Sequence, residues 1–246
     1  MLGLVAAACS GTSSTGSAAT STLTVFAASS LTAAFNQIGP DFTAANPGIT
    51  VTFNFGSSTD LAAQIQSEGT ADVFASASGI AMDSVEGDPG VTDRSVFATN
   101  RLVVITPPDD PAGIASIADL AKSGVQLVLA AKGVPVGDYA RQALTSAGIL
   151  QAAMQNVVSN EDDDASVVAK VTSGEADAGI VYTSDVVAAG NAVRSVTIPP
   201  AVNVVASYPI AVVGSTQSQA GTSFLDYVMG SKGQATLKDF GFGPAG

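Results

Sequence analysis

Short apolar runs alternate with longer segments of helical periodicity along most of the chain. The apolar runs predict β-strands over residues 23–27, 49–55, 72–75, 101–106, 126–130, 157–158, 178–182 and 208–213. Between and after them, apolar residues recur every three or four positions, as Leu61 and Ile65 do. These segments predict helices over residues 31–45, 59–68, 116–122, 137–147, 164–173, 219–229 and 232–240. Strands that alternate with helices indicate an α/β fold with parallel sheets.

One helix-to-strand turn occurs twice. The segment QSEGTAD (residues 66–72) leads from a predicted helix into a predicted strand, and KVTSGEAD (residues 170–177) does the same about a hundred residues later. This echo predicts two lobes of similar construction, although such turns also look alike in unrelated places. A length of 246 residues suits one large domain or two lobes of about a hundred residues each.

Composition excludes several classes of function. Hydrophobic residues make up 46% of the chain and charged residues 12%, which is enough apolar material for a packed core. Nine Lys and Arg face twenty-one Asp and Glu, so the net charge of −12 disfavours binding to nucleic acid or to anionic membranes. This charge does not exclude an anionic ligand held in a cleft by neutral dipoles.

The chain offers no residue set for catalysis. It contains no histidine, which removes the commonest general base and metal ligand, and the serine pairs have no Ser-x-x-Lys motif to supply a lysine base. The acidic run at residues 162–164 lacks the spaced oxygen ligands of a calcium loop and fits a helix start better. We therefore expect a protein that is not an enzyme and carries no cofactor.

The single cysteine follows an apolar stretch rich in small residues. MLGLVAAA runs directly into Cys9, and this junction resembles the lipobox of bacterial lipoproteins, in which the cysteine is acylated. The stretch is short and lacks a basic start, so residues 1–22 read as a truncated signal segment followed by a flexible Ser/Thr-rich tether. We expect an extracytoplasmic protein anchored to the membrane through Cys9. The alternative is an incidental cysteine in a disordered tail.

Four predicted helices begin in small, hydroxyl-bearing or acidic turns: Ser29-Ser30, Gly56-Ser57-Ser58, Pro135-Val136-Gly137 and the acidic run at 162–164. A helix N-terminus presents unpaired backbone N–H groups and a partial positive charge, which suit an anion. In a parallel α/β sheet such turns gather at the carboxyl ends of the strands and face one crevice. Each turn taken singly also fits ordinary helix capping. Together, the four turns predict an anion site.

Five segments resemble the periplasmic molybdate-binding proteins of bacterial ABC transporters: VFAASSLTAAF, FGSSTDLAAQI, ADVFASA, VPVGDYARQAL and GIVYTSDV. They occur in matching order and spacing between residues 23 and 242. The resemblance implies a two-lobed type II periplasmic-binding-protein fold, each lobe a mainly parallel sheet flanked by helices. The first lobe would comprise residues 23–100 and 209–246, and the second residues 101–208.

The same resemblance implies a ligand site between the lobes, a monomeric protein and delivery of the ligand to an ABC permease. Ser30 and Ser58 would donate hydroxyl and backbone N–H, Val136 and Asp164 backbone N–H, and Tyr182 its phenol. All five groups would contact the oxygens of the anion. The Asp164 carboxylate would have to point away from the ligand, which capping its own helix would achieve.

A cage that holds donors and no acceptor favours a fully deprotonated oxyanion such as molybdate or tungstate over hydrogen phosphate. Asp60 is better placed to stabilise its helix dipole than to accept a proton, and Lys132 and Arg141 are interpreted as solvated surface charges. Sulfate also fits such a cage. The alternative functions are therefore a lipoprotein of the same fold for sulfate or another tetrahedral oxyanion, or a signalling or adhesion lipoprotein that binds none.

Overall fold

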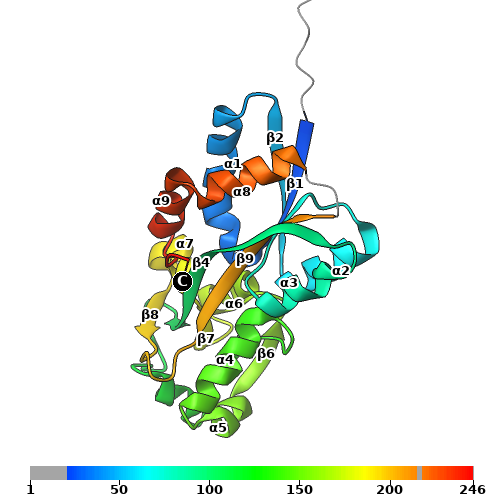
Figure 1. Ribbon diagram of the computed structural model, residues 1–246. Helices are drawn as coiled ribbons and strands as arrows, with labels where there is room; N and C mark the ends of the chain where they lie inside the picture. The colour runs from blue at the N-terminus through cyan, green and yellow to red at the C-terminus, as the bar shows by residue number, and fades with distance from the viewer. Residues whose placement is uncertain (1–20, 215–217, 246) are drawn as a thin grey trace, which may run out of the picture.

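The computed structural model describes residues 21–214 and 218–245, and it forms two lobes, each a sheet with helices packed on it (Figure 1). Cys9 lies outside the described residues. The strands are β1 (Ser21–Ala28), β2 (Ile49–Gly56), β3 (Val73–Ala75), β4 (Val91–Thr106), β5 (Leu127–Ala130), β6 (Val157–Glu161), β7 (Ala178–Tyr182), β8 (Arg194–Thr197) and β9 (Val205–Val213).

The helices follow the strands in an α/β order. They are α1 (Thr32–Ala45), α2 (Ser58–Glu68), α3 (Gly79–Glu86), α4 (Pro135–Ser146), α5 (Leu150–Gln155), α6 (Asp164–Thr172), α7 (Thr183–Ala189), α8 (Gln219–Met229) and α9 (Ser231–Asp239), with short 3-10 turns η1 (Ser29–Leu31), η2 (Ile117–Ala121) and η3 (Gly190–Ala192). In the described part of the chain, no helix has the length and hydropathy needed to cross a membrane.

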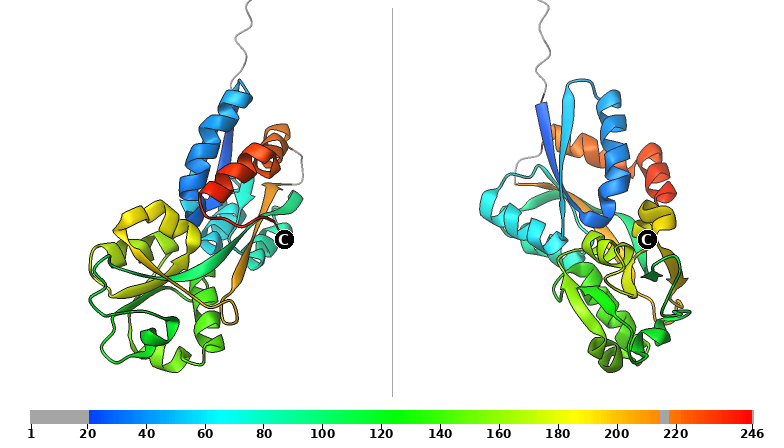
Figure 2. Two further views of the ribbon diagram at one scale, coloured as in Figure 1. Left: turned by 90° about the vertical axis from the view of Figure 1, so that its left-hand side faces the viewer. Right: turned by 180° about the vertical axis from the view of Figure 1, so that it is seen from behind.

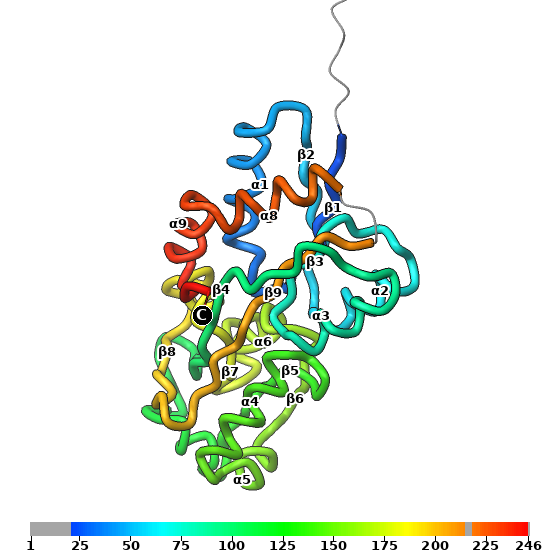
Figure 3. The backbone as a smooth tube through the Cα atoms, viewed as in Figure 1, coloured from blue at the N-terminus to red at the C-terminus, as the bar shows by residue number. Residues whose placement is uncertain are grey.

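Two long antiparallel strands connect the lobes. The strand order is β2-β1-β3-β9-β4-β7-β5-β6, with β8 paired to β4. β1 pairs in parallel with β2 and β3 in the first lobe, and β5 with β6 and β7 in the second, as the α/β prediction requires. β4 and β9 lie side by side and pass from one lobe to the other (Figure 3). They pair antiparallel with each other, and β9 also pairs antiparallel with β3, as β4 does with β7 and β8.

β4 is much longer than its predicted strand at 101–106. Its first part, residues 91–100, carries Asp93, Arg94 and Asn100 among the apolar residues, which hides the strand pattern in the sequence. A register shift between Thr92 and Ser95 against β9, with Asp93 at φ 57°, bends the strand there. Both predicted lobe boundaries fall inside β4 and β9, so the crossover segments are themselves strands.

Helices cover both faces of the first sheet (Figure 2). On one face Phe35 and Phe42 of α1 meet Phe224 of α8, with ring centroids 5.8 and 5.2 Å away from it. On the other face a smaller apolar cluster joins α2 and α3 to the sheet through Leu61, Ile65 and other buried residues. These packed layers position the starts of η1 and α2, which contact the second lobe through Ser29 and Thr59.

The repeated turn has the same structural role in both lobes. Asp72 Oδ2 accepts a hydrogen bond from the backbone N–H of Thr24 at 2.7 Å, and Asp177 Oδ2 accepts one from Gln126 N–H at 2.8 Å. Each aspartate thereby fixes the start of its strand to the neighbouring parallel strand, β3 to β1 and β7 to β5. The echo read from the sequence therefore reflects a shared construction.

Candidate functional site

A small cavity between the lobes is lined by all five residues predicted to bind the ligand: Ser30, Ser58, Val136, Asp164 and Tyr182. Six more residues border it, namely Ala28, Ser29, Ser57, Ala77, Val134 and Pro135. The four helix starts recognised in the sequence thus meet at one point, although they lie on both lobes.

Direct contacts hold the lobes together around this cavity. Thr59 Oγ1, on α2, donates to the carbonyl oxygen of Gly133 in the second lobe at 2.6 Å. Ser29 Oγ, on η1, donates to Asp164 Oδ1 on α6. Groups from both lobes therefore enclose the same small space.

Ser58 presents a hydroxyl proton to the cavity. The preceding residue, Ser57, caps α2 by accepting the N–H of Asp60 at 3.3 Å, which places Ser58 in the first turn. Ser58 is buried, and its Oγ accepts the backbone N–H of Ala77 at 2.9 Å. Because this oxygen already accepts a bond, the hydroxyl proton is free to be donated.

Ser30 is oriented by a tyrosine that sequence reasoning missed as a functional residue. Ser30 Oγ lies 2.9 Å from the hydroxyl of Tyr208 at the lobe junction. Burial raises the pKa of Tyr208 well above its ordinary value, so the phenol stays neutral. When Tyr208 donates to Ser30, the serine proton is left for the cavity. In the sequence Tyr208 is only an aromatic residue in a strand, with no local signal of this role.

Val136 supplies a backbone donor. Pro135 is the first residue of α4 and Val134 its N-cap, so the first hydrogen bond of the helix runs from Asp138 N–H to the Val134 carbonyl at 2.9 Å. The N–H of Val136 lies one turn too early for a helical partner. Its side chain is buried. Because the site needs only the backbone N–H of this residue, valine is compatible with the position.

Asp164 does not cap its own helix, and that prediction is wrong. Asp163 is the N-cap of α6, with its Oδ1 accepting Ser166 N–H at 2.8 Å. Because the extended backbone of Asp163 occupies the cap position, Asp164 falls in the first turn. The residue is only 3% exposed, and its side chain accepts the Ser29 hydroxyl of the other lobe. The backbone N–H keeps its place at the helix start, but the carboxyl group does not point away from the site.

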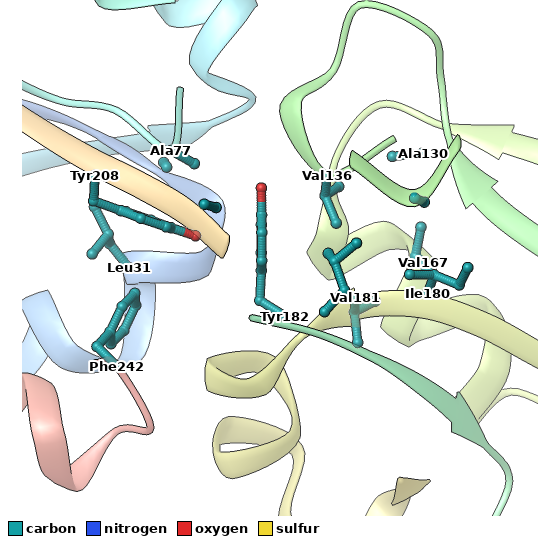
Figure 4. Packing of buried hydrophobic residues seen from close by; sticks show 14 of the residues in the cluster. Leu31, Ala77, Ala130, Val136, Val167, Ile180, Val181, Tyr182, Tyr208 and Phe242 are labelled. Atoms are coloured by element: carbon teal, nitrogen blue, oxygen red, sulfur yellow. The ribbon is translucent and has the colours of Figure 1, made fainter. Parts of the chain in front are cut away.

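Tyr182 ends β7 and is 1% exposed. Figure 4 shows its ring standing between Tyr208 and Val136, with the hydroxyl directed away from the β7 backbone. The ring packs edge-on against Tyr208, with centroids 5.9 Å apart. Within the described residues its hydroxyl has no hydrogen-bond partner, and burial raises its pKa well above the ordinary value. A neutral phenol without a partner next to the cavity can donate a hydrogen bond to an anion bound there.

No lysine or arginine lines the cavity. Lys132 is exposed, as expected. Arg141 is not a solvated charge, which corrects the interpretation of its sequence position. Its guanidinium donates to the carbonyls of Ala130 and Gly137 at 2.8 Å, because it lies over the junction of β5 and α4. It supports the turn that holds Val136 but does not reach the cavity.

The acidic run is a helix start, as its spacing indicated, since Asp163 caps α6. Among the described residues, no group of three or more His, Cys, Asp or Glu side chains is arranged to hold a metal ion. The cavity can thus offer an anion neutral donors from serine hydroxyls, a phenol and two helix N-termini.

Comparison with known proteins assigns the chain to a family. Residues 23–243 match the family described as bacterial extracellular solute-binding proteins. The molybdate-binding protein ModA of Mycobacterium tuberculosis is 40% identical over 222 residues, covering 89% of this chain and 84% of that protein. ModA of Escherichia coli is 32% identical over 228 residues, covering 89% and 88%.

A solved structure shares the fold. The periplasmic molybdate-binding protein of Azotobacter vinelandii superposes with a TM-score of 0.79 at 22% identity, covering 89% of this chain and 98% of that one. The two-lobed type II periplasmic-binding fold expected from the sequence is thereby confirmed. The matched family and the relatives are binding proteins and not enzymes, which confirms that the chain is not an enzyme. The chain belongs to the family of bacterial extracellular solute-binding proteins.

Proposed function

We propose that the protein captures molybdate, and tungstate equally well, in the interlobe cavity and delivers it to the permease of an ABC importer. The observation that carries this proposal is the convergence of Ser30, Ser58, Val136, Asp164 and Tyr182 on one cavity that lacks any lysine or arginine. Such a set binds the oxygens of the anion, so the metal itself needs no protein ligand. The names of the relatives support molybdate as the cargo.

The donor set is sufficient for tight binding. A hydrogen bond to a charged group contributes about 1.5–3 kcal/mol. Five such bonds, less the entropy of association and lobe closure, support a binding free energy of about −8 to −12 kcal/mol, which is a submicromolar Kd. A protein of this kind works as a monomer that captures the anion outside the cytoplasm.

Selectivity among oxyanions rests on size. The sequence predicts that hydrogen phosphate is excluded because the cage has no acceptor. The Asp164 carboxyl borders the cavity and could accept the proton of hydrogen phosphate, so the lack of an acceptor no longer explains the selectivity. Sulfate and phosphate are both smaller than molybdate and tungstate, and a cavity shaped for the larger anions leaves their oxygens short of the donors. Tungstate matches molybdate closely in size.

The proposal predicts a graded thermal shift. At a hundred times Kd, molybdate or tungstate stabilises the protein by about 2.7 kcal/mol. For a chain of this size that raises Tm by about 5–10 °C. Sulfate and phosphate should give much smaller shifts, as measured by scanning calorimetry at equal concentration. Equal or stronger stabilisation by sulfate would make the protein a sulfate binder, and no shift with any of the four would favour a signalling or adhesion role.

We further propose that a lipid on Cys9 anchors the protein to the outer face of the cell membrane, because a lipobox-like stretch precedes this residue and a polar tether follows it. The protein expressed in its host should label with fatty acid. Cys9→Ala should move it from the membrane to the soluble fraction without changing its Kd for molybdate. Membrane retention of the variant would place the anchor elsewhere.

A further inference from the structure

Two buried carboxyl groups, those of Asp164 and Asp185, lie beside the cavity, and their protonation determines the charge that a bound anion would face. Asp164 in α6 is 3% exposed and Asp185 in α7 is 8% exposed. Asp164 Oδ1 accepts the Ser29 hydroxyl, and Asp185 Oδ2 accepts the Tyr182 backbone N–H at 2.8 Å. Ser29 adjoins both side chains, because its hydroxyl donates to Asp164 and it lines an open cavity together with Asp185. Each carboxyl group also acts on the pKa of the other. Both carboxyl groups are therefore fixed in place by donors from other elements.

The remaining oxygen of Asp164 shows that this pair needs a proton. Asp164 Oδ2 is buried, and no donor within the described residues reaches it. The neighbouring Asp185 can satisfy it only as a protonated acid, because two carboxylates have nothing to donate. No lysine or arginine of the described chain forms a salt bridge with either side chain. A pair with no proton would place two uncompensated charges in a dry site.

The surrounding groups favour the protonated pair. Burial, followed by the Asp164 charge, raises the pKa of Asp185 well above its usual range, and burial raises that of Asp164. The titratable groups that act on the pair are Asp163 at the α6 cap, whose charge raises both pKa values, and the phenols of Tyr182 and Tyr208, which stay neutral. None of these groups supplies a positive charge.

The pair also contacts the ligand site directly, because Asp164 borders the same cavity as Ser30, Ser58 and Tyr182. With one proton the pair still carries one negative charge, next to the place where a dianion would lie. Like charges in a site without a cation repel strongly, whereas a fully protonated pair is neutral and leaves Asp164 able to donate.

We propose that Asp164 takes up one proton from solvent with each dianion that the site binds, and that the protonated Asp185 is the positioning residue that donates to Asp164 Oδ2 before and after binding. The inference rests on the proposed oxyanion function. The balance is one dianion, one proton and the singly protonated pair on one side, and the complex with a neutral pair on the other. Asp185 also borders a second, open cavity of about 470 Å³ beside α1 and α7, which gives the proton a route from solvent.

The test is isothermal titration of the full chain with sodium molybdate in two buffers of different ionisation enthalpy, at several pH values where molybdate is a dianion. Uptake of about one proton per anion is expected toward alkaline pH. Since the complex then holds one more proton than the free protein, Kd should rise about tenfold per pH unit there. At lower pH, where the free pair is already neutral, uptake and slope should both vanish.

Variants assign the proton to this pair. The double variant Asp164→Asn with Asp185→Asn keeps the size of both side chains and replaces the titratable carboxyl groups with amides. It should bind molybdate without proton uptake and with a Kd that does not change with pH. Asp162→Asn, an exposed position in the same acidic run, should behave as the unmodified chain. A melting curve for each variant confirms folding.

Two results would overturn the inference alone: molybdate binding without proton uptake at any pH, or uptake that persists in the folded double variant. The measurement on the unmodified chain decides the matter even if the double variant does not fold. Absence of binding heat with molybdate, tungstate, sulfate and phosphate would overturn the proposed function together with this inference, so the two failures are distinguishable.

Discussion

Replacing Gly137 with alanine should lower the stability of the protein by about 3 kcal/mol, which corresponds to a drop in Tm of about 6–12 °C. A Cβ at this position would lie 2.3 Å from the carbonyl oxygen of Ala131 and 2.4 Å from that of Ala130. Both are backbone atoms at the end of β5, and Arg141 holds the Ala130 carbonyl in place. The start of α4 must therefore move. Because Val136 lies in the same turn, anion affinity should fall as well.

Gly87 provides the matched control. It ends α3 with φ −78°, and a Cβ there would meet no atom within 4 Å. Gly87→Ala should leave Tm unchanged or raise it slightly, since alanine restricts the unfolded chain. Thermal unfolding without ligand measures both variants, and a titration with molybdate measures their affinity. A Gly137→Ala protein as stable as the Gly87→Ala protein would contradict the packing described for the start of α4.

Tyr182→Phe should weaken molybdate binding by about 1.5–3 kcal/mol, a ten- to hundredfold rise in Kd. The ring keeps its packing against Tyr208, and only the hydroxyl is lost. Without ligand this hydroxyl is buried with no partner in the described chain, so its removal should leave stability unchanged or raise it slightly. A tyrosine that served only the core would give the reverse, with lower stability and intact affinity.

Tyr227→Phe is the control for loss of a phenol. Tyr227 lies on α8, where its ring packs against Phe42, and it takes no part in the cavity. Its variant should bind molybdate with unchanged Kd. Titration calorimetry and a melting curve on each variant give both quantities. Unchanged affinity in Tyr182→Phe would remove the phenol from the site.

The helix starts could be predicted from the sequence because their signals are local. Ser57 followed by Ser58, and Pro135 followed by Val136 and Gly137, are capping patterns that short-range backbone chemistry dictates. The α/β order places these turns at the carboxyl ends of strands, so their meeting at one cavity follows from topology. The role of Tyr182 came from the family resemblance, and the structure adds that its hydroxyl is buried and unpaired.

The contacts between lobes could not be predicted in this way. Ser29 and Asp164 are 135 positions apart in the sequence, and no local pattern links them. The capping assignment failed by one residue: three consecutive aspartates all suit an N-cap, and only the observed backbone shows that Asp163 fills it. Tyr208 has no local motif, and the local signal of Asp185 is only the capping box of α7. The contact of Tyr208 with Ser30 and the influence of Asp185 on Asp164 join different elements.

Titration calorimetry of the purified chain with molybdate tests the central claim most directly. One site per monomer with a submicromolar Kd is expected, with tungstate binding equally well and sulfate and phosphate far more weakly. Binding of sulfate as tight as that of molybdate, or no heat with any of the four anions, would contradict the claim that this cavity is a molybdate site.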